Sequence, residues 1–141
     1  MNAPTHIDHI AIVTENLDDS LAFFATKLGL TVQHVEDLPE RGIRVAMLPL
    51  GNCRIELIQP LRDDSEVSAF LKKRGPGLHH LCLGTSAVDD DVKKLRSDGI
   101  TFTTDTPEAG AHGCRVAFVH PKSTGGVLVE LSQALRAQGT K

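Results

Sequence analysis

The chain has 141 residues, 40% of them hydrophobic, and a formal net charge of −3 at neutral pH, so we expect a single domain over residues 1–141 with one ordinary core. The mild negative charge provides no basic surface for nucleic acid, and the absence of Tyr and Trp leaves little surface for base stacking. No apolar run approaches membrane-spanning length, and three widely spaced cysteines fit free thiols in a reducing compartment. We therefore expect a cytoplasmic protein with neither nucleic acid nor a membrane as partner.

The first part of the chain predicts a strand, a helix and three further strands. Leu17, Leu21, Phe24 and Leu28 recur at helical spacing, Asn16 or Asp18 can cap this helix, and Gly29 ends it. The strands are predicted at His6–Thr14, Leu30–Glu36, Ile43–Leu50 and Asn52–Pro60. This module covers about residues 6–60, and a polar connector over 61–77 follows with a short helix near Ser65–Lys73.

The second part repeats the same order over about residues 78–133. A helix at Val88–Ser97 takes Ser86 as its N-cap, and strands are predicted at Leu78–Gly84, Ile100–Thr104, Cys114–His120 and Val127–Gln133. A four-stranded sheet with one helix cannot bury its apolar face alone, so the two modules should pair. The sequence thus predicts an α+β fold of two tandem βαβββ modules, forming a curved mixed sheet around a cavity.

Each module carries one His and one Glu at matching positions. Ile7–Ile12 is echoed by Leu78–Leu83, which aligns His9 with His80, and Ile55–Leu57 is echoed by Val129–Leu131, which aligns Glu56 with Glu130. Because side chains alternate along a strand, the apolar neighbours of each Glu take the opposite face. Two imidazoles and two carboxylates suit a divalent cation and leave two octahedral positions open. The cavity is therefore predicted to bind a metal through His9, Glu56, His80 and Glu130.

The remaining polar residues give weaker signals. His34 is interpreted as a surface residue, and the cysteines as small buried apolar groups. Pro121–Gly126 is an insertion before the strand of Glu130, and its Lys122, Ser123 and Thr124 are candidates for holding an anionic group of a substrate. The insertion lacks the spacing of a P-loop, so nucleotide hydrolysis gains little support.

The paired modules with inward His and Glu resemble the vicinal oxygen chelate superfamily, also known as the glyoxalase/bleomycin resistance/dioxygenase superfamily. Within it, residues 7–133 are similar to the methylmalonyl-CoA epimerase family. The more specific segments are Pro39–Val45, Ile55–Leu57 before Pro60, Gly77–His80, and Phe118–Leu131, which is similar to the C-terminal signature of that family.

The resemblance implies an isomerase that interconverts (2R)- and (2S)-methylmalonyl-CoA by metal-assisted transfer of the C2 proton through an enolate. It also implies an acyl-CoA as substrate, a homodimer, the same four metal ligands, and Glu130 as the catalytic base. Co²⁺ is the first expectation for the metal, with Mn²⁺, Zn²⁺, Ni²⁺ and Fe²⁺ as alternatives. Val45 occupies the position of a second Glu in some relatives and cannot carry a proton. Another residue, a metal-bound water or Glu56 is then left for the second proton transfer.

Two other functions remain open at the level of sequence. One is a different metal-dependent enzyme of the superfamily, glyoxalase I-like or extradiol dioxygenase-like, and a requirement for Fe²⁺ with oxygen sensitivity would favour the dioxygenase. The other is a metal-free small-molecule binding protein of the same fold. The sequence leaves open the native metal, the acyl group (methylmalonyl or ethylmalonyl) and the oligomeric state.

Overall fold

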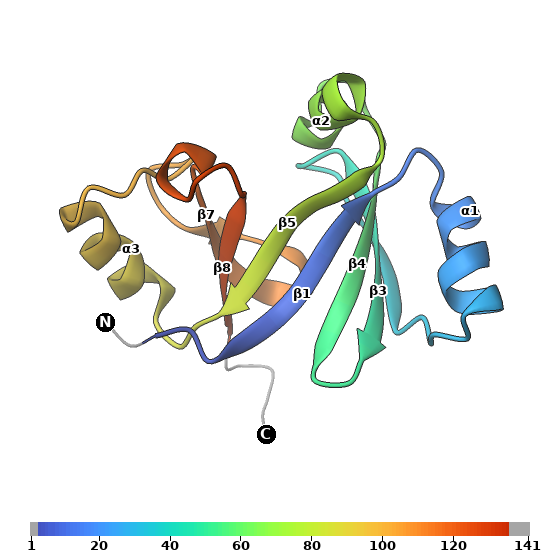
Figure 1. Cartoon of the computed structure of the whole chain (residues 1–141), viewed down its shortest axis with the longest axis horizontal. Helices are drawn as coiled ribbons and strands as arrows, with labels where there is room; N and C mark the ends of the chain where they lie inside the picture. The colour runs from blue at the N-terminus through green and yellow to red at the C-terminus, as the bar shows by residue number, and fades with distance from the viewer. Residues whose placement is uncertain (1–2, 136–141) are drawn as a thin grey trace. The chain divides into compact units, whose positions relative to one another are not determined.

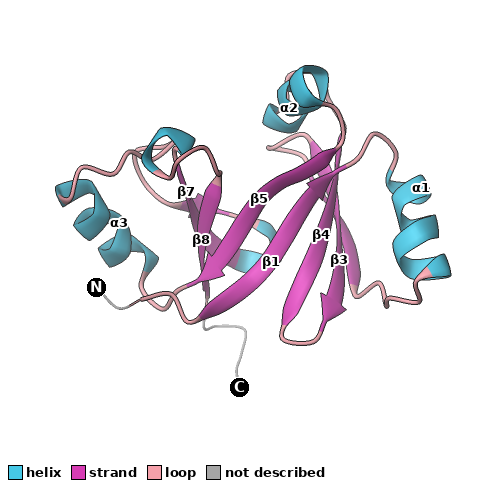
Figure 2. Ribbon diagram, in the orientation of Figure 1, coloured by secondary structure: helices cyan, strands magenta, loops and turns pink. Residues whose placement is uncertain are grey.

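The computed structural model describes residues 3–135, and these form two compact units. The first unit is His9–His79, and the second contains residues 3–8 and 80–135 of the described chain. Strands β1 (His6–Val13) and β5 (Gly77–Gly84) each begin in one unit and end in the other. The elements follow the order βαβββ twice (Figure 2), which confirms the predicted α+β class and both modules.

The first unit contains a mixed sheet in the order β2-β3-β4-β1 (Figure 1). Strands β2 (His34–Leu38), β3 (Ile43–Leu50) and β4 (Cys53–Pro60) are antiparallel neighbours, and β1 is parallel to β4. The bounds of β3 agree with the prediction. The strand predicted at Leu30–Glu36 is misplaced toward the N-terminus, because the Leu30 N–H donates to the Phe24 carbonyl at 3.0 Å and so closes the preceding helix.

Two helical segments precede β2. Helix α1 (Leu17–Leu21) begins after Asn16, whose side-chain oxygen accepts a hydrogen bond from the Asp19 N–H at 3.0 Å. The chain then continues as a π-helical segment, Ala22–Lys27. The predicted extent of the helix is therefore close to the structure, but the predicted winding is wrong for its second half.

Helices α1 and α2 pack on opposite faces of the first unit's sheet. The α1 face buries Leu17, Ala46, Leu48 and Leu57. Helix α2 (Glu66–Arg74), which is capped by Ser65, contributes Val67 to the other face, where it meets Ala11, Val13, Val45 and Ile58. Each of the Val, Leu and Ile side chains contributes about 1.5–3 kcal/mol when fully buried. Since Leu57 packs under α1, the side chain of the preceding Glu56 belongs to the α2 face.

The second unit's sheet follows the order β5-β8-β7-β6. Strand β8 (Val129–Ala134) is parallel to β5 and antiparallel to β7 (Cys114–Val119), which pairs with the two-residue β6 (Glu108–Ala109). The strand predicted at Ile100–Thr104 is wrong. Only a single bridge, Phe102 to Val119, forms there, with one backbone hydrogen bond on either side of it. Ile100 and Phe102 pack in the core beneath α3 (Val88–Ser97).

Helix α3 has the predicted bounds but a different start. Ala87 is the N-cap and makes no side-chain cap, so the prediction of Ser86 is wrong. The Val88 N–H instead donates to Gln133 Oε1 at 2.9 Å. In the first unit, the Leu17 N–H donates to Gln59 Oε1 at 2.7 Å. Each module therefore ties the first turn of its helix to a glutamine on its last strand. Within residues 3–135, no helix is long and apolar enough to cross a membrane.

Candidate metal centre

The first unit brings His9 and Glu56 together. In the parallel pair of β1 and β4, Ala11 is the partner of Glu56, and His9 lies two residues earlier on the same face of β1. His9 Nε2 lies 3.2 Å from Glu56 Oε1. The two residues are only 5% and 6% exposed. A buried imidazole therefore faces a buried carboxylate at one end of an apolar face.

The second unit repeats this arrangement with His80 and Glu130. Cys82 is the register partner of Glu130, as Ala11 is of Glu56. His80 Nε2 lies 2.9 Å from Glu130 Oε1, and the residues are 8% and 5% exposed. The Phe118 ring meets the His80 ring edge to face at 5.2 Å. The neighbouring His79 is half-buried and packs against Phe70 of α2, with 4.8 Å between ring centroids.

The donor atoms of each pair fit a divalent cation. Two ligands at right angles with bonds of about 2.1 Å lie about 3.0 Å apart, close to the 3.2 Å of His9–Glu56 and the 2.9 Å of His80–Glu130. Burying a carboxylate is costly unless a cation or hydrogen bonds compensate it. His9 and Glu56 are both among the described residues that could hold a metal ion. That all four residues hold the same ion stays a prediction.

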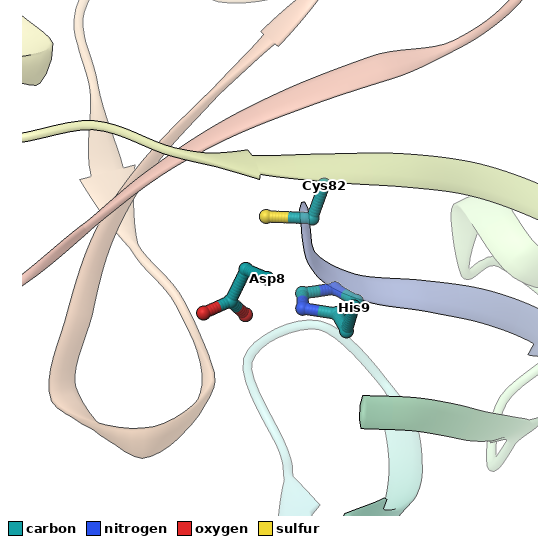
Figure 3. Close-up of side chains that lie close together, drawn as sticks. All are labelled: Asp8, His9 and Cys82. Carbon is teal, nitrogen blue, oxygen red and sulfur yellow. The ribbon is translucent and has the colours of Figure 1, made fainter. Parts of the chain in front are cut away.

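Asp8 and Cys82 lie near each other, a proximity that sequence reasoning missed. Figure 3 shows the Asp8 carboxylate and the Cys82 thiol, both of the second unit, together with His9, the residue that follows Asp8 in β1. A carboxylate oxygen of Asp8 and Sγ of Cys82 lie within 4.8 Å of each other. Cys82 is fully buried, as expected for a small apolar group. The carboxylate of Asp8 is thus one of the polar groups nearby.

The insertion before β8 forms a short 3₁₀ turn, Pro121–Ser123. Ser123 Oγ accepts a hydrogen bond from the Thr101 N–H at 3.0 Å, and Thr124 Oγ1 accepts one from the Val127 N–H at 3.0 Å. Lys122 is exposed. The two hydroxyls thus stabilise the loop itself, and the role of these three residues in substrate binding stays a prediction.

Val45 on β3, and the β2 residues beside it, occupy the region where some relatives carry a second Glu for proton transfer. Val45 is fully buried in the apolar cluster under α2, and Glu36 is its partner across β2 and β3. His34, interpreted from sequence as a surface residue, is half-buried, and its Nε2 lies 2.8 Å from Glu36 Oε1. A His two residues before a Glu on one strand was the signal that could have revealed this pair.

Arg44 and Arg115 occupy matching positions in the two modules, in Arg44–Ala46 and Arg115–Ala117, and neither belongs to the two His–Glu pairs. Arg44 holds Asp37 of β2, and Arg115 holds Asp89 of α3, each through two hydrogen bonds. Hydrogen bonding and charge from the guanidinium lower the pKa of each Asp below its ordinary value. These partly exposed pairs support the surface of each unit.

Comparison with known proteins agrees with this geometry. Residues 8–118 match the Glyoxalase/Bleomycin resistance protein/Dioxygenase superfamily, and the chain belongs to that superfamily. The mitochondrial methylmalonyl-CoA epimerase of Mus musculus is 40% identical over 91% of this chain and 72% of its own length. The ethylmalonyl-CoA/methylmalonyl-CoA epimerase of Cereibacter sphaeroides is 35% identical over 90% of this chain and 96% of its own.

A solved structure is similar over nearly the whole chain. It is a methylmalonyl-CoA epimerase in complex with methylmalonyl-CoA and NH₄⁺, with a TM-score of 0.91 and 37% identity, over 98% of this chain and 100% of that chain. The homologues and structural neighbours are thus methylmalonyl-CoA epimerases, which confirms the family resemblance drawn from the sequence motifs.

Proposed function

We propose that this protein is a methylmalonyl-CoA epimerase, which interconverts the (2R) and (2S) forms of methylmalonyl-CoA. The observation that carries the proposal is the buried His–Glu pair present once in each unit. The activity named for relatives that match nine-tenths of the chain supports it.

We propose that His9, Glu56, His80 and Glu130 together hold one divalent metal ion. Co²⁺ is the first candidate, with Mn²⁺, Zn²⁺, Ni²⁺ and Fe²⁺ as alternatives. When bound, the ion would stabilise the negative charge that develops on the thioester oxygen as the C2 proton leaves. These four neutral or anionic side chains alone would not offset that charge, whereas a dication held in a buried site would do so without reorganisation.

Glu130 is the proposed base that removes the C2 proton. Its carboxylate is buried and held beside His80 at 2.9 Å, so its orientation is fixed before substrate binds. C2 lies between a thioester and a carboxylate, and loss of its proton leaves an enolate whose negative charge grows on the thioester oxygen. Lys122, which is exposed, is the best suited of the loop residues to an anionic group of the acyl-CoA, with Ser123 and Thr124 holding the loop in shape.

The superfamily includes other activities, and the same donor set could serve a glyoxalase I-like or extradiol dioxygenase-like enzyme. A metal-free binding protein of this fold is a further alternative. It would have no need of two buried His–Glu pairs, whose burial costs free energy. We also propose a cytoplasmic homodimer, by analogy with the family.

The test is incorporation of solvent deuterium at C2 of methylmalonyl-CoA, followed by mass spectrometry. Chelated protein should be inactive, and Co²⁺ should restore incorporation. Glu130→Gln should reduce it by at least about 100-fold, the usual contribution of a general base, whereas Glu15→Gln at an exposed position should leave it unchanged. Metal-loaded protein that incorporates no deuterium would rule out the epimerase, and near-normal incorporation by Glu130→Gln would remove Glu130 as the base.

A further inference from the structure

The first unit contains a second His–Glu pair besides His9–Glu56, and it lies on the edge strand β2. His34 Nε2 and Glu36 Oε1 are 2.8 Å apart, a hydrogen-bond distance. Their side chains are 36% and 29% exposed, so solvent or a small molecule can reach them. We refer to His34 and Glu36 as the β2 dyad.

The strand register places the β2 dyad on the same face of the sheet as Glu56. His34 is the partner of Met47, and Met47 is the partner of Glu56. Cross-strand partners in an antiparallel sheet share a face, and residues two apart on a strand do so as well. With strands about 4.8 Å apart, the Cα atoms of His34 and Glu56 are separated by roughly 10 Å, a span that two side chains and a small acyl group can fill.

The positions between the β2 dyad and Glu56 cannot transfer a proton. Met47 and Val45, the partners of His34 and Glu36, are 1% and 0% exposed. Their apolar side chains offer no group that could exchange a proton in place of the imidazole or the carboxylate. The β2 dyad therefore combines a polar pair that solvent can reach with an apolar border toward Glu56.

Inversion at C2 requires two proton-transfer groups, one on each face of the carbon. The proton must leave from one face of the carbon, and another must arrive at the opposite face. Imidazole both accepts and donates protons near neutral pH, and a carboxylate on one ring nitrogen fixes its orientation and stabilises its charged form.

We propose that the β2 dyad supplies one of the two proton-transfer groups, with His34 exchanging the proton and Glu36 positioning His34. This proposal rests on the proposed epimerase activity. In one direction, the carboxylate of the proposed base, Glu130, accepts the C2 proton, and the C–H electron pair passes into the enolate. The His34 imidazolium then gives its proton to the opposite face of C2. In the other direction, neutral His34 accepts the C2 proton and the protonated carboxylate donates one. Exchange with solvent restores both groups.

The test separates proton removal from inversion. A single epimer of methylmalonyl-CoA is incubated with metal-loaded protein in D₂O, and both C2 deuterium content and epimer composition are followed. In His34→Gln, epimerisation should fall by about 100-fold or more, while deuterium incorporation with retention of configuration from one epimer stays within a few-fold of wild type. Glu36→Gln should shift the same ratio in the same direction by about tenfold, because His34 remains present but is less well held.

Asp37→Asn is the matched control. Asp37 lies on the same strand, but it alternates to the other face and pairs with Arg44, so the ratio of incorporation to epimerisation should not change. Equal loss of both rates in His34→Gln and in a second variant, His34→Asn, would overturn the proposal, as would an unchanged ratio. Absence of both rates in wild-type protein would instead refute the epimerase activity, and the role of the β2 dyad with it.

Discussion

Arg44 and Arg115 occupy matching positions in the two modules, and each bonds to an Asp, but the two Asp residues lie in different kinds of element. Arg44 bonds to Asp37 on the adjacent strand, with 2.6 Å between Nε and Oδ1, whereas Arg115 bonds to Asp89 in helix α3, with 2.8 Å between Nε and Oδ2. The two modules thus share the arginine and its position on the strand. The aspartate that pairs with it belongs to a neighbouring strand in the first module and to a helix in the second.

Acid sensitivity is predicted for the Asp89–Arg115 pair. Because the guanidinium lowers the pKa of Asp89 below its ordinary 3.8, the pair stabilises the folded state above that pH and loses this contribution as the pH falls through the lowered pKa. Asp89→Asn should therefore flatten the acid side of the stability profile below about pH 4. Thermal melting from pH 7 to pH 2.5 measures this, with Asp90→Asn as the control. Parallel profiles for wild type and Asp89→Asn would contradict it, a small effect being expected for so exposed a pair.

At this scale, local alternation was enough to indicate on which face of its strand each Glu lies. Glu56 and Glu130 stand between apolar residues that pack under helices, so their position on the opposite faces followed from the strand period. The proximity of Asp8 and Cys82 could not be derived that way. The two residues are far apart in sequence, and no local period encodes which distant residues come near each other.

At the scale of elements, the two modules share one way of anchoring their helices. Gln59 on β4 accepts from the Leu17 N–H, and Gln133 on β8 accepts from the Val88 N–H. Helix α1 also has the side chain of Asn16 as a cap, but α3 has no side-chain N-cap. The second module therefore depends more heavily on its glutamine.

We predict that Gln133→Leu destabilises the protein more than Gln59→Leu. Loss of the Gln133 acceptor at the Val88 N–H should lower the free energy of unfolding by about 1–2 kcal/mol. Loss of the Gln59 acceptor beside the capped α1 should lower it by about half as much. Urea denaturation followed by circular dichroism gives both values, with Gln33→Leu as a surface control. The opposite ranking would show that the strand glutamines are not helix anchors.

The predicted bounds of an element agree with the structure where a turn-forming residue marks each end of the segment. Ile43–Leu50 is bounded by Gly42 and Gly51, both at positive φ, and the observed strand has those bounds. The π-helical winding of Ala22–Lys27 escaped prediction because its apolar spacing also fits an α-helix. Ile100–Thr104 has the composition of a strand, but its apolar side chains, Ile100 and Phe102, pack in the core under α3, and the segment is not a regular strand.

For the whole molecule, the proposed metal site at the buried His–Glu pairs predicts that the stability of the fold depends on metal. A cation that binds only the folded state adds about 2.7 kcal/mol at a free concentration 100 times its Kd. For a chain of this size we expect Co²⁺ to raise the Tm of chelated protein by roughly 5–15 °C. Scanning calorimetry measures the shift, which should be lost in His9→Ala and His80→Ala and kept in Lys122→Ala. An equal shift in all four proteins would place the metal elsewhere.

The two units do not coincide with the two sequence repeats. The first residues of β1 belong to the unit built mostly by the second repeat, and the first residues of β5 belong to the unit built mostly by the first. His9 and His80 are the first residues after each crossing. Each sequence repeat therefore contributes residues to both units. The connector that contains α2 keeps the two repeats in one chain, so they are always present in a ratio of one to one.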